Sequence, residues 1–202
     1  MAALTDKRPL CAACLRPQSA CICQWVTPVE SLVEVLILQH PLEVNNAKGS
    51  ARLLHLSLSH SRMLCGEAFN AQAFAPQRKH DILLYPDTMT DSAIGMPAPP
   101  TLNVAWLQDP SQLRLIVLDG TWRKSRKMLY QSPPLQHLPR LALQGLGASR
   151  YRIRKAHKPD QLSTLEATCA ALMQLECNTE KFQPLLNAFD GFVAQQLAYR
   201  DE

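Results

Sequence analysis

The chain has 202 residues, of which 47% are hydrophobic and 19% charged, a composition typical of a globular domain rather than a disordered one. This length favours a single domain. The N-terminal sequence MAALTDKRPLC lacks the apolar core of a secretory signal, and no apolar run reaches the ~18 residues needed to cross a bilayer. A cytoplasmic protein without membrane contact is therefore predicted.

Positive charge is concentrated in one part of the chain, although the net charge is only +4. Residues 114–158 contain eleven Lys or Arg and one acidic residue, Asp119, a local balance of +10 against −6 elsewhere. Such a block indicates a phosphate-binding surface. A solvated basic face without a partner has the same composition and stays open as an alternative.

Four of the seven cysteines lie within thirteen residues and are spaced C-x2-C-x6-C-x-C. Four thiolates can complete the tetrahedral shell of zinc, and a metal would stabilise a segment with few apolar residues. Because the C-x-C end is not the commonest zinc spacing, an iron–sulfur cluster or four free thiols stay open. Cys65, Cys169 and Cys177 are predicted to be packing residues. The cluster consists of Cys11, Cys14, Cys21 and Cys23.

Short apolar segments at residues 33–39, 81–85 and 114–118 predict buried strands of a parallel sheet. The first two are separated by residues 46–64, whose leucines are spaced as on one buried face of a helix. Strand, helix and strand in this order predict an α/β fold with a mostly parallel sheet flanked by helices.

Helices are also predicted in the second half of the chain. Thr121 is a suitable N-cap for one that ends at the sequence SPP, residues 132–134. Ser163 and Glu166 fit the S-x-x-E capping box of the next, and the last runs from about residue 181 to 199. The apolar stripe of the helix after Ser163 is Leu165, Cys169, Leu172 and Leu175.

Polar residues follow the predicted strands at the carboxyl edge of the sheet, where open α/β folds bind ligands. The sequence LQHPLEVNNAKGSARLL places His40, Glu43 and Arg52 after the first strand, and LLYPD ends the second at Pro86. Simpler explanations also fit, namely a turn at His40, a solvated Glu43 and a strand-ending proline.

The third strand ends in Asp119, which Gly120 and a helix N-cap follow. A turn and a cap explain this sequence by themselves, but a carboxylate beside a phosphate-binding face also suits a general base acting on nucleic acid. A carboxyl group is a poor base unless burial raises its pKa, and neighbouring cations lower it. We therefore expect Arg123 and Lys124 to face RNA while Asp119 packs against Trp122 and apolar strand ends.

Two further segments carry polar groups suited to ligand binding. Arg152 and Arg154 would share a face in a strand and form a pair of phosphate donors. Ser163 and Thr164 offer hydroxyl groups and helix N-terminal amides to the carboxylate of a ligand. The capping box alone also explains Ser163 and Glu166.

The cysteine cluster, LQHPLE, LLYP, LDGTW with its basic helix, YRIR and STLEA occur in this order over nearly the whole chain. This ordered set resembles the DTW-domain family, in particular its bacterial tRNA-uridine aminocarboxypropyltransferases. The resemblance implies a SPOUT-like α/β fold with a C-terminal knot, S-adenosylmethionine as donor and N3 of a uridine in the tRNA variable loop as acceptor. Residues 1–28 would form a zinc-binding segment and residues 29–202 the catalytic domain.

The resemblance also implies roles for individual residues. Asp119 would be the catalytic acid or base, with Thr121 and Trp122 in the same site, and any zinc would be structural. No obligate protein partner is implied. The expected donor-binding residues are His40, Pro86, Gly120, Ser163, Thr164 and Glu166. The basic residues expected to bind tRNA are Arg52, Arg123, Lys124, Arg126, Lys127, Arg150, Arg152, Arg154, Lys155 and Lys158.

Two other functions stay open on the sequence alone. A SPOUT-like RNA methyltransferase would share the fold, the donor and the basic surface, because the same donor carries a methyl group on its sulfonium. A zinc-containing RNA-binding protein without catalysis would bind RNA but not the donor.

Overall fold

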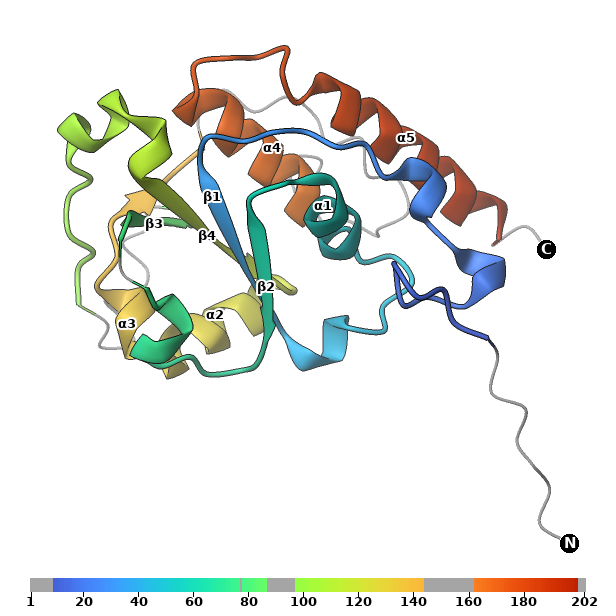
Figure 1. Ribbon diagram of the computed structural model, residues 1–202. Coiled ribbons are helices and arrows are strands. Elements are labelled where there is room, and N and C mark those ends of the chain that lie inside the picture. The colour runs from blue at the N-terminus through green and yellow to red at the C-terminus, as the bar shows by residue number, and fades with distance from the viewer. Residues whose placement is uncertain (1–8, 77, 87–96, 144–161, 200–202) are drawn as a thin grey trace, which may run out of the picture.

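A parallel sheet of five strands in the order β2-β1-β4-β3-β5 forms the centre of the protein (Figure 1). The computed structural model describes residues 9–76, 78–86, 97–143 and 162–199. Every neighbouring pair of strands is parallel, which confirms the predicted α/β sheet. The strands are β1 (Glu34–Gln39), β2 (Ser61–Cys65), β3 (His80–Leu84), β4 (Leu113–Asp119) and β5 (Arg140–Leu141).

Helices cover both faces of the sheet (Figure 1). One face carries α1 (Ala51–Ser57), α4 (Thr164–Leu175) and α5 (Gln183–Ala198), and the other carries α2 (Trp122–Gln131) and α3 (Pro133–Gln136). Among the described residues, no helix combines the length and the hydropathy needed to span a membrane. Short 3₁₀ helices are η1 (Gln18–Ala20), η2 (Cys23–Trp25), η3 (Pro41–Glu43), η4 (Ala71–Phe74), η6 (Val104–Gln108) and η7 (Pro110–Gln112).

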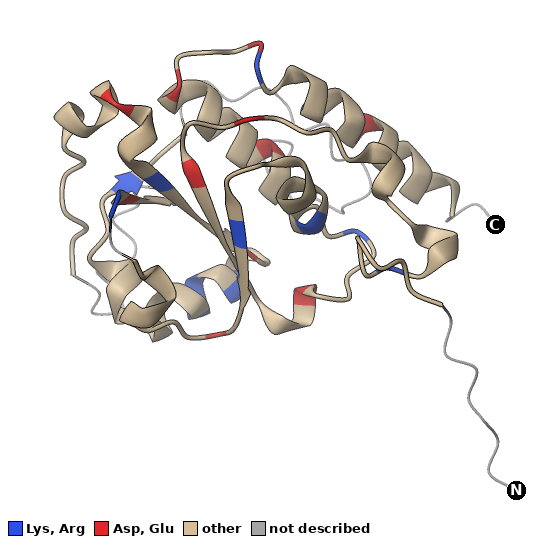
Figure 2. Ribbon diagram, in the orientation of Figure 1, with Lys and Arg blue, Asp and Glu red and all other residues tan. Residues whose placement is uncertain are grey.

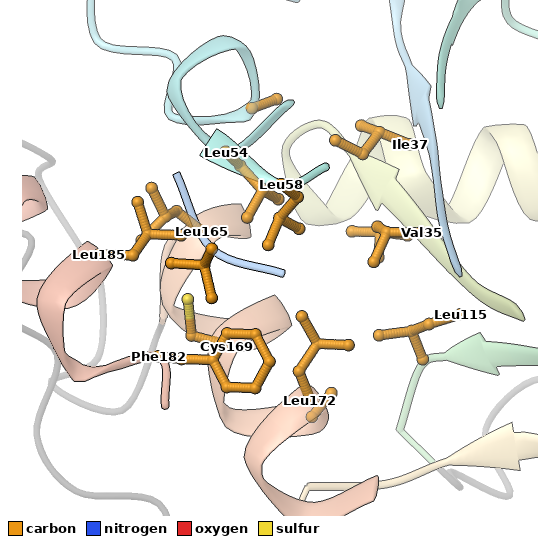
Figure 3. Packing of buried hydrophobic residues seen from close by; sticks show 14 of the residues in the cluster. Val35, Ile37, Leu54, Leu58, Leu115, Leu165, Cys169, Leu172, Phe182 and Leu185 are labelled. Atoms are coloured by element: carbon orange, nitrogen blue, oxygen red, sulfur yellow. The ribbon is translucent and has the colours of Figure 1, made fainter. Parts of the chain in front are cut away.

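The hydrophobic core lies in two layers because side chains alternate along each strand. Val35 and Ile37 of β1 face the layer under α4, whereas Leu36 and Leu38 face the layer under α2. Figure 3 shows the first layer, where side chains of α4 meet those of β1 and β4. The predicted apolar stripe of α4 is confirmed, since Leu165, Cys169, Leu172 and Leu175 are all buried there.

Two sequence predictions are corrected, one about a helix and one about single cysteines. The helix expected over residues 46–64 ends at Ser57, and Ser61–Cys65 form strand β2 instead. β2 lies at the edge of the sheet, so its side chains do not alternate clearly between buried and exposed. Its apolar residues therefore also fit a helical pattern. Cys65 and Cys177 are exposed rather than packed, while Cys169 is buried as expected.

One arginine of the basic block is part of the core rather than the surface. Arg114 is only 1% exposed, and its Nε and Nη2 donate to the two carboxylate oxygens of Asp81 at 2.6 and 2.9 Å. Nη1 lies 3.7 Å from a carboxylate oxygen of Glu34. Because Arg114 is the second residue of β4 and lies between the acidic residues of β1 and β3, its charge is neutralised inside the sheet.

Replacing Asp81 with Ala is expected to lower the free energy of unfolding by about 3 kcal/mol, because the buried guanidinium of Arg114 loses its bidentate partner. Urea denaturation measures this change. Lys79→Ala is the control: Lys79 forms a longer, partly exposed pair with Glu34 at 3.8 Å and should cost less than about 1 kcal/mol. Equal losses in the two variants would contradict a special role for the Asp81 pair.

Candidate functional site

Asp119 lies at the carboxyl edge of the sheet, where β1 and β4 end side by side. The register pairs it with Gln39, and the backbone N–H of His40 donates to its carbonyl at 3.0 Å. The Asp119 side chain is 5% exposed, and its carboxylate accepts hydrogen bonds from Gln39 Nε2 at 2.8 Å and from Thr164 Oγ1 at 2.6 Å. The expected burial is confirmed, but these two neighbours of the carboxylate are polar rather than apolar.

The turn after Asp119 positions the start of α2 as the sequence predicted. Thr121 is the N-cap, and its hydroxyl accepts a hydrogen bond from the backbone N–H of Lys124. Gly120 allows close packing, because a Cβ there would lie 3.1 Å from Cβ of Lys124. The carboxylate of Asp119 therefore stands directly beside the N-terminus of a helix.

The N-terminus of α4 meets the same carboxylate. The predicted capping box is confirmed: the Ser163 hydroxyl accepts from the N–H of Glu166, whose carboxylate accepts from the N–H of Ser163. The N–H of Leu165 donates to the hydroxyl of Ser50. Helix positions expected to offer hydroxyls and amides to a ligand are thus already engaged in local contacts, and the Thr164 hydroxyl orients Asp119.

Glu43 is a site residue that the sequence placed at this edge but whose role it left open. It lies in η3 just after β1, is 9% exposed, and accepts hydrogen bonds from Lys124 Nζ at 2.7 Å and Asn46 Nδ2 at 2.7 Å. The solvated Glu43 considered above is therefore wrong, and so is the expectation that Lys124 faces RNA. The motif LQHPLE was the signal, but the pairing joins residues 81 positions apart and has no local pattern.

A polar pocket of about 130 Å³ opens at this edge. It has acidic groups at Asp119 and Glu43, a basic group at Lys48, and two helix N-termini on its walls. This combination suits a small zwitterion, because both signs of charge find a partner in it. The lining residues are Glu43, Asn46, Lys48, Gly49, Ser50, Asp119, Gly120, Thr121, Ser163 and Thr164.

Two residues expected at the donor site have other contacts. His40 is buried, its Nδ1 accepts from the N–H of Leu42, and its Nε2 lies 3.1 Å from a carboxylate oxygen of Glu67. Pro86 follows β3, and its carbonyl accepts a hydrogen bond from Arg140 at 3.3 Å. Neither residue is among those that line the pocket.

Trp122 begins α2 and is 53% exposed. Its indole makes an edge-to-face contact with the buried Tyr85, at 5.6 Å between ring centroids. The guanidinium of Arg140 lies 5.1 Å from the centroid of the Tyr85 ring. Trp122 therefore presents an open aromatic surface, supported by Tyr85, at the third position after Asp119 in the sequence.

The basic residues expected to bind tRNA that fall in the described part of the chain do not form a single group. Figure 2 shows basic residues on α2, where Arg123 and Arg126 are exposed and Lys127 pairs with Glu67 at 2.5 Å. Arg52 lies elsewhere and donates to the carbonyl of Ala13. The remaining candidates, Arg150, Arg152, Arg154, Lys155 and Lys158, lie outside the described residues.

The four cysteines of the N-terminal cluster converge as their spacing predicted. All four Sγ atoms lie within 4.8 Å of one another, with 3.6 Å between Cys11 and Cys23 and 3.8 Å between Cys14 and Cys21. Metal–sulfur bonds of about 2.3 Å in a tetrahedral shell place the sulfurs about 3.8 Å apart. The donor set therefore fits a single tetrahedral metal ion.

Local hydrogen bonds favour a thiolate in this cluster. The backbone N–H groups of Cys14 and Ala13 lower the pKa of Cys11 to about 6, whereas burial raises the pKa of Cys23 to about 12. The lowered pKa favours the thiolate form of Cys11 near neutral pH. A bound cation would then draw the other thiols into the thiolate form.

The protein is of the α/β class. It combines an open parallel sheet with a polar pocket at the carboxyl edge of the sheet and a four-cysteine cluster. The family model described as the DTW domain matches residues 8–197, and the chain belongs to that family. No significant match exists among solved structures.

The curated relatives carry related names. The chain is 25% identical to tRNA-uridine aminocarboxypropyltransferase 2 of Macaca fascicularis, over 96% of this chain and 65% of the relative. It is 28% identical to the protein of that name in Drosophila melanogaster, over 95% and 76%. It is 29% identical to tRNA-uridine aminocarboxypropyltransferase A of Arabidopsis thaliana, over 62% and 52%. These relatives are eukaryotic, and the chain spans less than two thirds of the macaque protein.

Metal analysis of the purified protein is expected to find one metal ion per chain, and Cys14→Ser to lose it with a fall in Tm, because three thiolates hold the metal far less tightly than four. Cys177→Ser is the matched control, since that thiol is exposed and outside the cluster. A wild-type protein that is free of metal after purification in reducing buffer would contradict the prediction.

Proposed function

We propose that this protein transfers the 3-amino-3-carboxypropyl group of S-adenosylmethionine to N3 of a uridine in the variable loop of a tRNA, in the cytoplasm. The observation that carries the proposal is the Asp119 carboxylate, buried at the floor of a polar pocket and oriented by Gln39 and Thr164. Its place in the DTW sequence, together with the names of the relatives, supports this reaction class over others.

The reaction is a displacement at carbon. N3 of the uridine forms a bond to the terminal methylene of the aminocarboxypropyl chain, the bond from that carbon to the sulfonium breaks, and a neutral thioether leaves. The N3 proton must be removed, and Asp119 accepts it directly or through a water. Because the sulfonium bears three carbons, the choice of product rests on which carbon is held in line with N3.

The pocket is expected to hold the amino-acid end of the donor. About 130 Å³ is less than the roughly 300 Å³ at which pockets for drug-sized ligands begin, so it suits one part of the molecule. Glu43 would attract the ammonium group, and Lys48 the carboxylate. The other donor-binding residues in this proposal are His40, Pro86, Gly120, Ser163, Thr164 and Glu166.

We propose zinc as the metal of the cysteine cluster, with a structural role. The sulfur separations leave space for one ion, whereas an iron–sulfur cluster would place several irons between the thiolates. Residues 1–28 would then be the metal-binding segment and residues 29–202 the catalytic domain. A SPOUT-like knotted topology is part of the same proposal, supported by the parallel sheet with helices on both faces.

The acceptor tRNA is proposed to approach along the N-terminal part of α2. Arg123 and Arg126 are exposed there and can contact phosphates, with Trp122 between them and the pocket edge. Thr121 and Trp122 complete the proposed acceptor side of the catalytic site. The further tRNA-binding residues in the proposal are Arg52, Lys127, Arg150, Arg152, Arg154, Lys155 and Lys158.

The direct test is nucleoside mass analysis of unmodified tRNA after incubation with the protein and S-adenosylmethionine. A uridine that gains the mass of an aminocarboxypropyl group supports the proposal. A gain of one methyl group would make the protein a methyltransferase. Calorimetry that detects binding of tRNA but not of S-adenosylmethionine would favour the non-catalytic RNA-binding protein.

Asp119→Asn is expected to lower the transfer rate at least about a hundredfold, because an amide cannot accept the N3 proton. Asn keeps the size of the side chain and an acceptor for Thr164, and the Gln39 amide can turn to offer its oxygen. Donor affinity and Tm should therefore change little, as calorimetry and thermal melting would show. An active Asp119→Asn enzyme would exclude the carboxylate as the base.

Trp122→Ala is expected to raise the KM for tRNA about tenfold, since stacking of one base on an aromatic ring is worth roughly 1–3 kcal/mol. N3 lies on the pairing edge of uracil, so the base must leave its partners and needs a surface to rest on. Tyr130→Ala is the control, because Tyr130 is 58% exposed at the other end of α2. An equal effect of the two substitutions would contradict a specific role for Trp122.

A further inference from the structure

We infer that Arg16 is a positioning residue for the donor pocket, through which the cysteine segment (residues 9–25) holds the pocket loop (residues 43–50) in place. The inference rests on the proposed function for the identity of the ligand. Arg16 itself lies outside the pocket and would touch neither donor nor acceptor.

Three hydrogen bonds join the two segments. The Arg16 guanidinium donates from Nη1 to the carbonyl of Ala47 at 2.6 Å and from Nη2 to the carbonyl of Gly49 at 2.8 Å. In the opposite direction, Arg52 Nη2 donates to the carbonyl of Ala13 at 2.9 Å. Hydrogen bonds from charged donors are stronger than neutral ones, so this contact constrains the loop at two successive turns.

The pocket loop is also held at its two ends, where Glu43 pairs with Lys124 and Ser50 accepts from Leu165. Residues 44–48 are exposed, and backbone hydrogen bonds in this stretch form local turns, such as Asn46 N–H to the Glu43 carbonyl and Gly49 N–H to the Asn46 carbonyl. A stretch without buried side chains between two fixed ends depends on outside contacts for its position. Arg16 supplies these contacts where the loop forms the pocket wall at Lys48 and Gly49.

The effect of the loop reaches Asp119 in two steps. Ser50, which ends the loop, accepts a hydrogen bond from the N–H of Leu165 near the start of α4. The neighbouring Thr164 hydroxyl orients the Asp119 carboxylate. A shift of the loop would therefore alter both the pocket wall and the partner of the proposed base.

The cysteine segment is itself held in place by contacts with α5, so it can hold the pocket loop in position. Trp25 Nε1 donates to Gln195 of α5, whose amide donates to the carbonyl of Cys21. The indole of Trp25 packs so closely on α5 that a Cβ at Gly191 would lie 2.1 Å from it. Arg16 stands beside this support, with its guanidinium 5.3 Å from the ring centroid of Phe192.

The turn that aims Arg16 belongs to the cysteine cluster. Leu15, directly before Arg16, has a φ of 59°, in the left-handed region that non-glycine residues seldom adopt. Its backbone N–H donates to the carbonyl of Cys11 at 2.8 Å, and Cys14 precedes it. Leu15 is thus tied to two cysteines of the cluster, to Cys11 by this hydrogen bond and to Cys14 by the chain, so a metal held by them would stabilise the turn that directs Arg16 to the loop.

The first test is hydrogen exchange of the full-length protein without ligand. Arg16→Met keeps an apolar stem against Phe192 but removes the donors, and amides of residues 44–52 are expected to exchange about tenfold faster. Arg62→Met is the matched control, because exposed Arg62 donates to one loop carbonyl, that of Ala75, outside the pocket. Unchanged exchange over residues 44–52 in Arg16→Met would overturn the inference.

The second test measures S-adenosylmethionine binding by calorimetry in the same variants. Arg16→Met should raise the dissociation constant about tenfold while metal content and tRNA affinity stay at wild-type values. Arg16→Lys, which retains the charge and one donor group, should fall between the two and serves if the Met variant fails to fold. A faster-exchanging loop with wild-type donor affinity would overturn the positioning role.

The two tests also separate this inference from the proposed function. If the wild-type protein does not bind S-adenosylmethionine, the proposed function fails, but faster exchange over residues 44–52 in Arg16→Met still supports the contact between segment and loop. If the wild-type protein binds the donor and Arg16→Met matches it in both tests, the proposed function stands and the inference is wrong.

Discussion

The register of β1 against β4 determines where the parts of the candidate site lie. Because Gln39 stands opposite Asp119, its amide reaches the carboxylate, and the segments that follow the two strands leave the sheet together. Glu43 after β1 and Lys124 after β4 are thereby brought within 2.7 Å. The site has the acidic groups Asp119 and Glu43 and two helix N-termini in its lining.

The sequence predicted local features well and long-range contacts poorly. The three central strands, the caps at Thr121 and Ser163 and the cysteine geometry follow from patterns that span a few residues, and the structure confirms them. The short edge strand β2 was missed because half-exposed residues leave no alternation to detect. The burial of Arg114 and the pairing of Glu43 were missed for another reason. Each depends on a partner from a distant segment, and counting charges along the sequence does not identify such a partner.

The cysteine segment and the carboxyl edge of the sheet share contacts, although the sequence assigns them to separate units. Cys14 and Ile22 belong to the same hydrophobic cluster as Val35 and Ile37 of β1. The segment also contacts α5, the loop after η3 and the side chain of Arg52. A metal at the cysteines would therefore stabilise a segment that packs into the core and contacts the pocket loop. Loss of the metal is expected to lower both stability and ligand affinity.

The polar groups at the two ends of β4 also restrict which structures the chain can form. Arg114 at one end meets Asp81 and Glu34 on both neighbouring strands, and Asp119 at the other meets Gln39. The residues between are Leu, Ile and Val, which would pack about equally well after a shift of two positions. Such a shift would separate each buried charge from its partner. A shifted alignment of β4 is thus destabilised at both ends of the strand. The two ends select the correct alignment, and the apolar residues between them do not have to specify it.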